Sequence, residues 1–450
     1  MARSRPSRLV AGPSLSRRNF LRAGGALGAL AVASPLLAAC GGDSGGGGGG
    51  GGTTGIGGAD LDQLKELLGV DADSAAKGVE LSMGAVLALT GPGAFYGKVM
   101  AKGIDLAVAQ IKAAGGPTIT VDYQDHESGS AQAGANATRQ LGTARTPVCL
   151  ASYVGALGSM FPGLEQYKML ALDGGGGASD FGQGKPYFWG FKAIEPDDYF
   201  SGVTAYWKAT APQMKRVSLV AIDQGQINEI VQTNFEKTFT DAGFEVASVE
   251  FTPIGTTDFT STLGALRSTA PDGVFVFLVG NDAGYFMKGY QSAGLTFPVV
   301  GAEYTADARD AAAGAFDQYS FSTDWFDAAN PSNPLAKLFV DSYVAEYGEQ
   351  PDYYAANYWE DTMAVWDLVR RVTAAGDDIS GDTLQDALVA SPTFKSVYGG
   401  TADAVGELTL DTKIHSPISR PLGIYTCSGD SVTQVASFGI GGTDFQLTAK

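Results

Sequence analysis

The chain has 450 residues, 44% of them hydrophobic, so it is long enough for two or three domain-sized units around a large buried core. Its formal net charge is -18 at pH 7. Because residues 1–39 hold six arginines and no acid, the remainder carries 24 basic against 48 acidic side chains, a net charge of -24. A surface this negative repels phosphate backbones and anionic headgroups, which argues against nucleic-acid binding and against basic membrane-docking patches.

The first forty residues have the pattern of an export signal. A basic segment ends in SRRNFL at 16–21, an apolar run follows over 26–39, and Cys40 comes next. The apolar run is too short and too rich in small residues for an ordinary membrane span. The paired arginines resemble a twin-arginine signal, and LAAC at 37–40 resembles a lipobox whose cysteine receives the lipid. We therefore expect residues 1–40 to be a lipoprotein signal peptide. The alternative is an ordinary cleaved signal with a chance cysteine.

A glycine-rich segment follows the cysteine directly. Residues 41–58 include an unbroken glycine run from Gly45 to Gly52. Glycine at this density forms a flexible coil, and 18 such residues reach roughly 20–25 Å on average. We expect this segment to be a tether that holds an exported body at the outer face of the cell membrane, on the periplasmic side where an outer membrane is present.

The rest of the chain alternates short apolar runs with amphipathic helical stretches. Residues 59–78 are predicted to hold a short accessory helix. The first unit is predicted to have strands at 81–89, 118–123, 148–151 and 169–172 and a helix at 97–114. The second is predicted to have strands at 217–222, 246–251, 274–279 and 298–301, with helices at 229–242, 259–268 and 285–293. Long helices at 335–347 and 354–372 precede short strand-like pieces near 408–410 and 422–426. This alternation predicts an α/β fold with two doubly wound units.

Residues for catalysis are scarce. The two histidines, His126 and His415, do not lie in a nucleophile or zinc motif, and no G-x-S-x-G sequence occurs. The acidic segment with Asp122, Asp125, His126 and Glu127 is a weak metal candidate, since such clusters are more often solvated loops or helix caps. We therefore expect no enzyme activity, no metal and no cofactor.

Two further features have a simple structural interpretation. The glycine run at 174–177 lacks the Gly-Lys-Ser/Thr ending of a phosphate loop, although glycines after a strand let the backbone approach a ligand. The cysteines that remain after processing, Cys149 and Cys427, have no spacing that requires a disulfide. We expect two unpaired, partly buried thiols.

Several motifs, in order, resemble one protein family. LALTGPGAFYG at 87–97, AAGG at 113–116, GFEV at 243–246, AGL at 293–295 and GAE at 301–303 are similar to the type I periplasmic binding proteins. The similarity is greatest to their branched-chain (hydrophobic) amino-acid branch, and it extends over about residues 79–430. It implies two Rossmann-like lobes joined by three hinge crossovers. The N-lobe would comprise 79–193 plus 324–420, and the C-lobe 194–323 plus 421–450.

The resemblance also implies a ligand site between the lobes. Positions that match the loops holding the ligand's carboxylate are Tyr153, Val154, Gly155, Gly176, Gly177 and Ser179. Glu303 matches the acid that pairs with the ammonium, and the remaining matches, to pocket walls, are Phe95, Tyr96, Gln226, Asn281 and Tyr358. The chain departs from the family where a serine and a threonine are usual, with Val154-Gly155 and Gly177 instead. These glycines make room for a larger or differently shaped solute.

The function implied is that of a monomeric solute-binding lipoprotein of an ABC importer, which delivers a small molecule to the permease subunits. Hydrophobic amino acids are the first solute class, followed by amides, urea-like compounds and aromatic acids. One alternative is a ligand sensor of the same fold that signals to a membrane partner. The other is an exported enzyme.

Overall fold

The computed structural model describes residues 60–71, 74–152, 154–176, 185–193, 196–429 and 431–448. The expected signal peptide, 1–40, and the tether, 41–58, therefore lie outside the described residues. Within the described ranges, no helix combines the length and the apolar character needed to cross a membrane.

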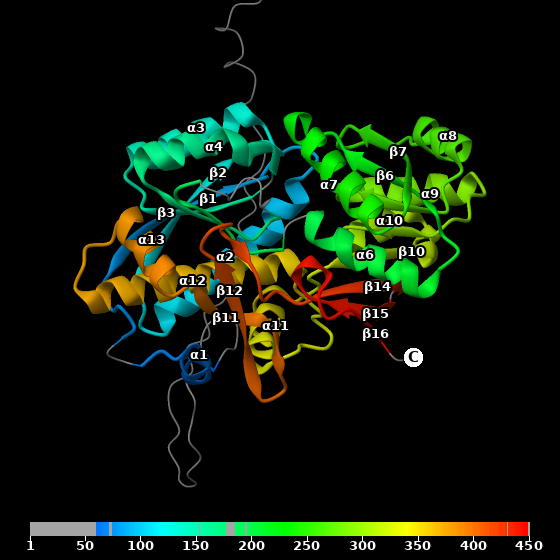
Figure 1. Ribbon diagram of the computed structural model, residues 1–450. Coiled ribbons are helices and arrows are strands. Elements are labelled where there is room, and N and C mark those ends of the chain that lie inside the picture. Colours follow the sequence, from blue (N-terminus) through cyan, green and yellow to red (C-terminus); the bar gives the residue numbers. More distant parts are fainter. Residues whose placement is uncertain are drawn as a thin grey trace, which may run out of the picture. The chain divides into compact units, whose positions relative to one another are not determined.

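The first sheet is wholly parallel and has the strand order β2-β1-β3-β4-β5 (Figure 1). Its strands are β1 (Glu80–Leu87), β2 (Thr118–Asp125), β3 (Val148–Ala151), β4 (Leu170–Asp173) and β5 (Phe188–Gly190). The central strands β3 and β4 are buried at every position, as expected of short apolar strands covered on both faces.

Side chains alternate between the two faces of this sheet. Val86, Cys149 and Ala171 share a core with residues of α3 (Ala131–Thr143) and α4 (Val154–Tyr167), two helices that lie on one side of the sheet (Figure 1). Ala85, Leu150 and their neighbours share a core with α2 (Ala94–Ala113) and α12 (Tyr353–Ala375) on the other face. The same core includes α11 (Pro334–Tyr347), α13 (Gly381–Ala390) and the small antiparallel sheet. That sheet comprises β11 (Thr393–Thr401), β12 (Ala404–Asp411) and β13 (Ser416–Pro417). We call this assembly the N-lobe.

The second sheet has the order β16-β15-β14-β10-β9-β8-β6-β7. Its parallel part consists of β6 (Arg216–Ile222), β7 (Glu245–Thr252), β8 (Gly273–Phe277), β9 (Val299–Gly301) and β10 (Tyr319–Thr323). The antiparallel edge consists of β14 (Leu422–Ser428), β15 (Ser431–Phe438) and β16 (Gln446–Leu447). Its helices are α6 (Asp197–Thr210), α7 (Asn228–Asp241), α8 (Thr260–Thr269), α9 (Asn281–Ser292) and α10 (Ala306–Ala312). These elements have a core of their own, and we call them the C-lobe.

The α/β fold class predicted from the sequence is confirmed, and the predicted strands agree with the observed ones to within a few residues. The accessory helix α1 (Leu61–Leu68) is shorter than expected, because Gly69 adopts a left-handed conformation that ends it. The sequence analysis did not predict β5, β10, β11, β15 or α6. Cys149 and Cys427 are free thiols in different sheets. Both are buried, whereas the sequence analysis expected partial burial.

The N-lobe helices α2 and α12 cross in close contact. A Cβ atom on Gly103 would come within 2.2 Å of the Ala355 carbonyl oxygen, so only glycine allows this approach. Helix α12 also holds the segment that precedes β1. The Trp366 indole donates to the Ala75 carbonyl at 3.0 Å, and Arg370 donates to the carbonyls of Gly69 and Ser74 at 3.0 and 2.9 Å.

Candidate functional site

The two parallel sheets place a set of loops at the carboxyl ends of their strands, where open α/β sheets bind ligands. In the N-lobe these loops follow β1, β3 and β4, and in the C-lobe they follow β6, β8 and β9. The residues singled out from the sequence lie in or beside them, with Tyr358 on α12 below the N-lobe loops. Tyr153, Gly177 and Ser179 lie outside the described residues, as do the side chains of Val154 and Gln226 and the lipidation candidate Cys40.

Glu303 follows β9 and is 2% exposed. Its Oε1 accepts hydrogen bonds from the Tyr96 hydroxyl at 2.5 Å and from the Gly280 N–H at 2.6 Å. Its Oε2 accepts from the hydroxyls of Tyr353 and Tyr354, both at 3.2 Å. Gly280 has φ +56°, ψ −136°, a conformation open to glycine, and this turns its N–H toward the carboxylate. The structure thus brings together two predicted site residues, Tyr96 and Glu303, through a direct bond between the lobes.

Four other predicted site residues lie near the Glu303 site or in or beside the N-lobe loops. Phe95 is half-buried beside Tyr96, with the rings packed edge to face at 5.7 Å. Asn281 is exposed at the start of α9, one residue from Gly280. Gly155 lies in the first turn of α4, and Gly176 has a φ of +121° in the loop after β4.

Below that loop lies a buried polar cluster, which includes Tyr358. Its hydroxyl donates to the Ala151 carbonyl, and Asn357 donates to the Gly174 carbonyl at 2.8 Å. Asp173 accepts from the Gly175 N–H at 2.8 Å. Asp361 is fully buried, and its carboxyl oxygens have no hydrogen-bond partner among the described residues. Burial raises its pKa well above the usual range, and the nearby acids Glu360 and Asp173 add to the effect.

The sequence analysis missed Asn357 and Asp361. A signal was present, because positions 357, 358 and 361 share one face of the predicted helix at 354–372. Polar residues on an otherwise apolar helix face are candidates for a buried site.

The segment considered as a metal site has a structural role in its described residues. Asp125 accepts hydrogen bonds from the N–H groups of Leu89 and Glu127 and from the Thr90 hydroxyl, which closes the turn between β1 and α2. His126 is fully buried, with Nδ1 accepting from the Gly129 N–H at 3.0 Å and Nε2 3.1 Å from the Ser152 hydroxyl. Burial lowers the His126 pKa to about 4. No cluster with metal-binding geometry occurs in the part of the chain that the structure describes.

An apolar pocket of about 430 Å³ lies next to the Glu303 cluster. Aromatic walls come from both lobes and from the segment after β10, namely Phe95, Tyr304, Trp325, Phe326, Tyr343 and Tyr353. Three acids, Asp327, Glu349 and Asp352, lie at its lining, and no lysine, arginine or histidine among the described residues does. The pocket therefore suits an apolar group and offers no cation to an anion.

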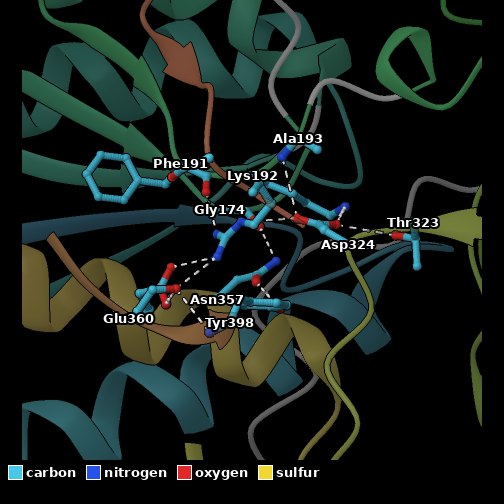
Figure 2. Close-up of polar contacts among 12 residues, drawn as sticks. Gly174, Phe191, Lys192, Ala193, Thr323, Asp324, Asn357, Glu360 and Tyr398 are labelled. Atoms are coloured by element: carbon cyan, nitrogen blue, oxygen red, sulfur yellow. Dashed lines mark hydrogen bonds and ion pairs between the residues drawn. The ribbon is translucent and has the colours of Figure 1, made fainter. Parts of the chain in front are cut away.

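The chain passes between the lobes three times, and each crossover contributes one buried charge. Lys192 follows β5, Asp324 follows β10, and Arg420 precedes β14. Lys192 donates to Asp324 at 2.6 Å and to the Tyr199 hydroxyl at 2.8 Å, as Figure 2 shows for the ion pair. Arg420 pairs with Asp324 at 3.3 Å and with Glu360 of α12 at 2.9 Å. We call Lys192, Asp324, Arg420 and Glu360 the hinge cluster. Its ion pairs connect the three crossovers to α12 of the N-lobe.

Comparison with known proteins agrees with this architecture. Residues 80–418 match the family model described as periplasmic binding protein. The chain belongs to the periplasmic binding protein family. This match confirms the family resemblance predicted from the sequence.

Three solved structures illustrate how this periplasmic binding protein compares with others. A leucine-binding protein from Thermotoga maritima has 18% identity and a TM-score of 0.69, covering 79% of this chain and 98% of its own. The Streptococcus pneumoniae branched-chain amino-acid binding protein in complex with isoleucine has 20% identity, a TM-score of 0.67 and coverages of 79% and 99%. An R. palustris ABC-transporter solute-binding protein in complex with benzoate has 22% identity, a TM-score of 0.68 and coverages of 82% and 98%. At these identities the likeness establishes the fold.

Proposed function

We propose that this periplasmic binding protein is the exported, lipid-anchored solute receptor of an ABC importer. The observation that carries the proposal is the bond between Tyr96 and Glu303, which joins the first turn of α2 in the N-lobe to the loop after β9 in the C-lobe. A solute held between such loops stabilises the closed state through contacts with both lobes, and closure presents one composite surface to the permease subunits.

The proposed lobe boundaries are 79–193 plus 324–420 and 194–323 plus 421–450, with a monomer as the working unit. The separate cores of the two lobes and the three crossovers support this division. The proposed solute site comprises the predicted residues at the carboxyl ends of the parallel strands, including Gln226, Asn281 and the glycine loop after β4. The first solutes to test are leucine, isoleucine and benzoate, because the three similar structures are a leucine-binding protein and complexes with isoleucine and with benzoate.

A thermal-shift screen of the purified protein tests the proposal. A ligand at a hundred times its dissociation constant adds about 2.7 kcal/mol to the stability of the native state, which gives a clear rise in melting temperature. We expect at least one small apolar solute to give such a rise. The receptor should also copurify with ABC permease subunits. Copurification with a membrane signalling protein instead would favour the sensor, and turnover of a solute would favour an enzyme.

A further inference from the structure

Protein donors already occupy the acid that the family resemblance assigns to a solute ammonium. An ionised carboxylate accepts about four hydrogen bonds, two at each oxygen. From the described residues Glu303 receives four, three from tyrosine hydroxyls and one from a backbone N–H, while it is 2% exposed. Its accepting capacity is therefore filled in the state described.

These donors come from both lobes. Tyr96 belongs to α2, and Tyr353 and Tyr354 begin α12, so all three hydroxyls are from the N-lobe. Glu303 and Gly280 belong to the C-lobe. We call these five residues the interlobe lock, because the hydrogen bonds from the three tyrosines to Glu303 join the two lobes directly.

The tyrosines of the lock are held in place by their rings. Tyr96 and Tyr354 pack edge to face at 5.1 Å, and Tyr353 and Tyr354 lie 4.2 Å apart. All three are 4% exposed or less. An ammonium that reached Glu303 would displace at least one hydroxyl from the carboxylate and leave it buried without that acceptor, which is unfavourable.

The loop assigned to the solute carboxylate is altered as well. In that loop the Gly175 N–H donates to the chain's own Asp173. A solute carboxylate would compete for this donor with an acid fixed at the end of β4. One backbone donor beside the assigned carboxylate positions is thus already used by the protein.

The space beside the lock favours an apolar group, because the three acids at its lining are already bonded within the protein. Asp327 accepts from the Ala329 N–H, Glu349 pairs with Lys102, and Asp352 accepts from the Tyr354 N–H. The pocket of about 430 Å³ has walls of Tyr304 and Trp325 as well as the lock residue Tyr353. Its volume is in the range of small-molecule sites, and aromatic walls suit a ring or a branched alkyl chain.

We infer that the solute carries no ammonium group, and that its aromatic or branched aliphatic body packs in this pocket beside a lock that the protein closes itself. This inference rests on the proposed function and narrows its solute class. It differs from the ammonium-binding role that the family resemblance implies for Glu303.

Matched ligands test the inference by titration calorimetry on the purified protein. The first pair is L-leucine and 4-methylpentanoate, and the second is L-phenylalanine and 3-phenylpropanoate, each accompanied by the uncharged amide of its amine-free acid. We expect an amine-free compound in at least one series to bind tenfold or more tightly than its amino acid. Comparing the affinity of each amine-free acid with that of its amide then shows whether the protein prefers an anionic or a neutral solute. Tighter binding of an amino acid, or binding by none of the six compounds, would overturn the inference.

Two variants separate the lock from an ammonium site. In Glu303→Gln, closure is weakened for every solute, so the ratio of amine-free to amino-acid affinity should stay within threefold of wild type. A tenfold shift of that ratio against the amino acid would show that Glu303 binds its ammonium. In Tyr96→Phe one acceptor position on Glu303 becomes available, and the relative affinity for the amino acid should rise at least threefold. No change in Tyr96→Phe would also count against the lock.

Failure of the solute-class inference can be distinguished from failure of the proposed receptor function. If an amino acid is preferred, the solute-class inference fails while the receptor function stands. If no compound in the broader thermal-shift screen raises the melting temperature, the receptor function itself fails.

Discussion

Lys192 and Asp324 form an ion pair between two crossovers, with Nζ and Oδ1 2.6 Å apart and both side chains fully buried. Breaking a buried pair by removing one partner leaves an uncompensated charge, which costs about 3–5 kcal/mol. We expect Lys192→Met to lower the free energy of unfolding by that amount, measured by urea denaturation. Lys337→Met is the matched control, because the Lys337–Asp341 pair is exposed and contributes little. Equal effects in the two variants would contradict a structural role for the hinge cluster.

Two helical glycines should respond to alanine in opposite directions. In Gly103→Ala the new methyl group meets the Ala355 backbone, and we expect a loss of about 1–3 kcal/mol from overpacking between α2 and α12. A methyl group on Gly264 of α8 would have no neighbouring atom within 4 Å, so Gly264→Ala should gain about 0.5–1 kcal/mol from helix propensity. Thermal unfolding of both variants measures the contrast. A stabilised Gly103→Ala protein would refute the close crossing of these helices.

His126 should make stability depend on pH in a predictable direction. Its pKa is lowered by burial from 6.5 to about 4, so the folded state disfavours the protonated imidazole. As pH falls from 6.5 to 4, the unfolded chain binds a proton that the folded chain does not, and stability is lost; above pH 6.5 the contribution is complete. The full effect is about 3 kcal/mol.

The variant His126→Gln isolates this effect. Acids with raised pKa values, such as Asp282 at about 6, change stability in the opposite direction, so the wild-type profile alone mixes several groups. We expect the difference in unfolding free energy between wild type and His126→Gln to shrink as pH falls from 7 to 4. A difference that stays constant over this range would show that His126 does not titrate as the structure implies.

Cys40→Ser tests the proposed lipid anchor. The sequence LAAC with a glycine tether behind it leads us to expect that this variant leaves the membrane fraction for the soluble one. Fractionation with high-salt and carbonate washes measures it, with Cys149→Ser as a control that keeps the lipobox. A Cys40→Ser protein that stays on the membrane after both washes would disprove the anchor.

The fold was predictable because its signals are local. Short apolar strands such as Val148–Ala151 and long helices such as Ala94–Ala113, with its apolar residues on one face, are visible in a window of a few residues. The position of Glu303 was predictable for the same reason, since it follows the apolar strand β9 directly.

The partners of these residues were not predictable in the same way. Tyr353 and Tyr354 reach Glu303 from fifty residues away, and no local pattern marks a tyrosine as a donor to a particular acid. Lys192 is a lone cation in an apolar segment, and only the fold brings Asp324 and Arg420 to it. Interactions of this kind depend on tertiary packing, which one sequence does not specify residue by residue.

The attachment of Gly69, Ser74 and Ala75 to α12 decides where force enters the molecule. Arg370 and Trp366 hold these residues by hydrogen bonds to their carbonyl groups, so a pull on the chain before Asp60 is transmitted to the longest helix described in the N-lobe. With a lipid at Cys40, the anchored end of the chain is thus attached to the N-lobe and not to the C-lobe. The same helix begins with Tyr353 and Tyr354, so the attachment of the N-terminal segment and the N-lobe side of the interlobe lock depend on one helix, α12.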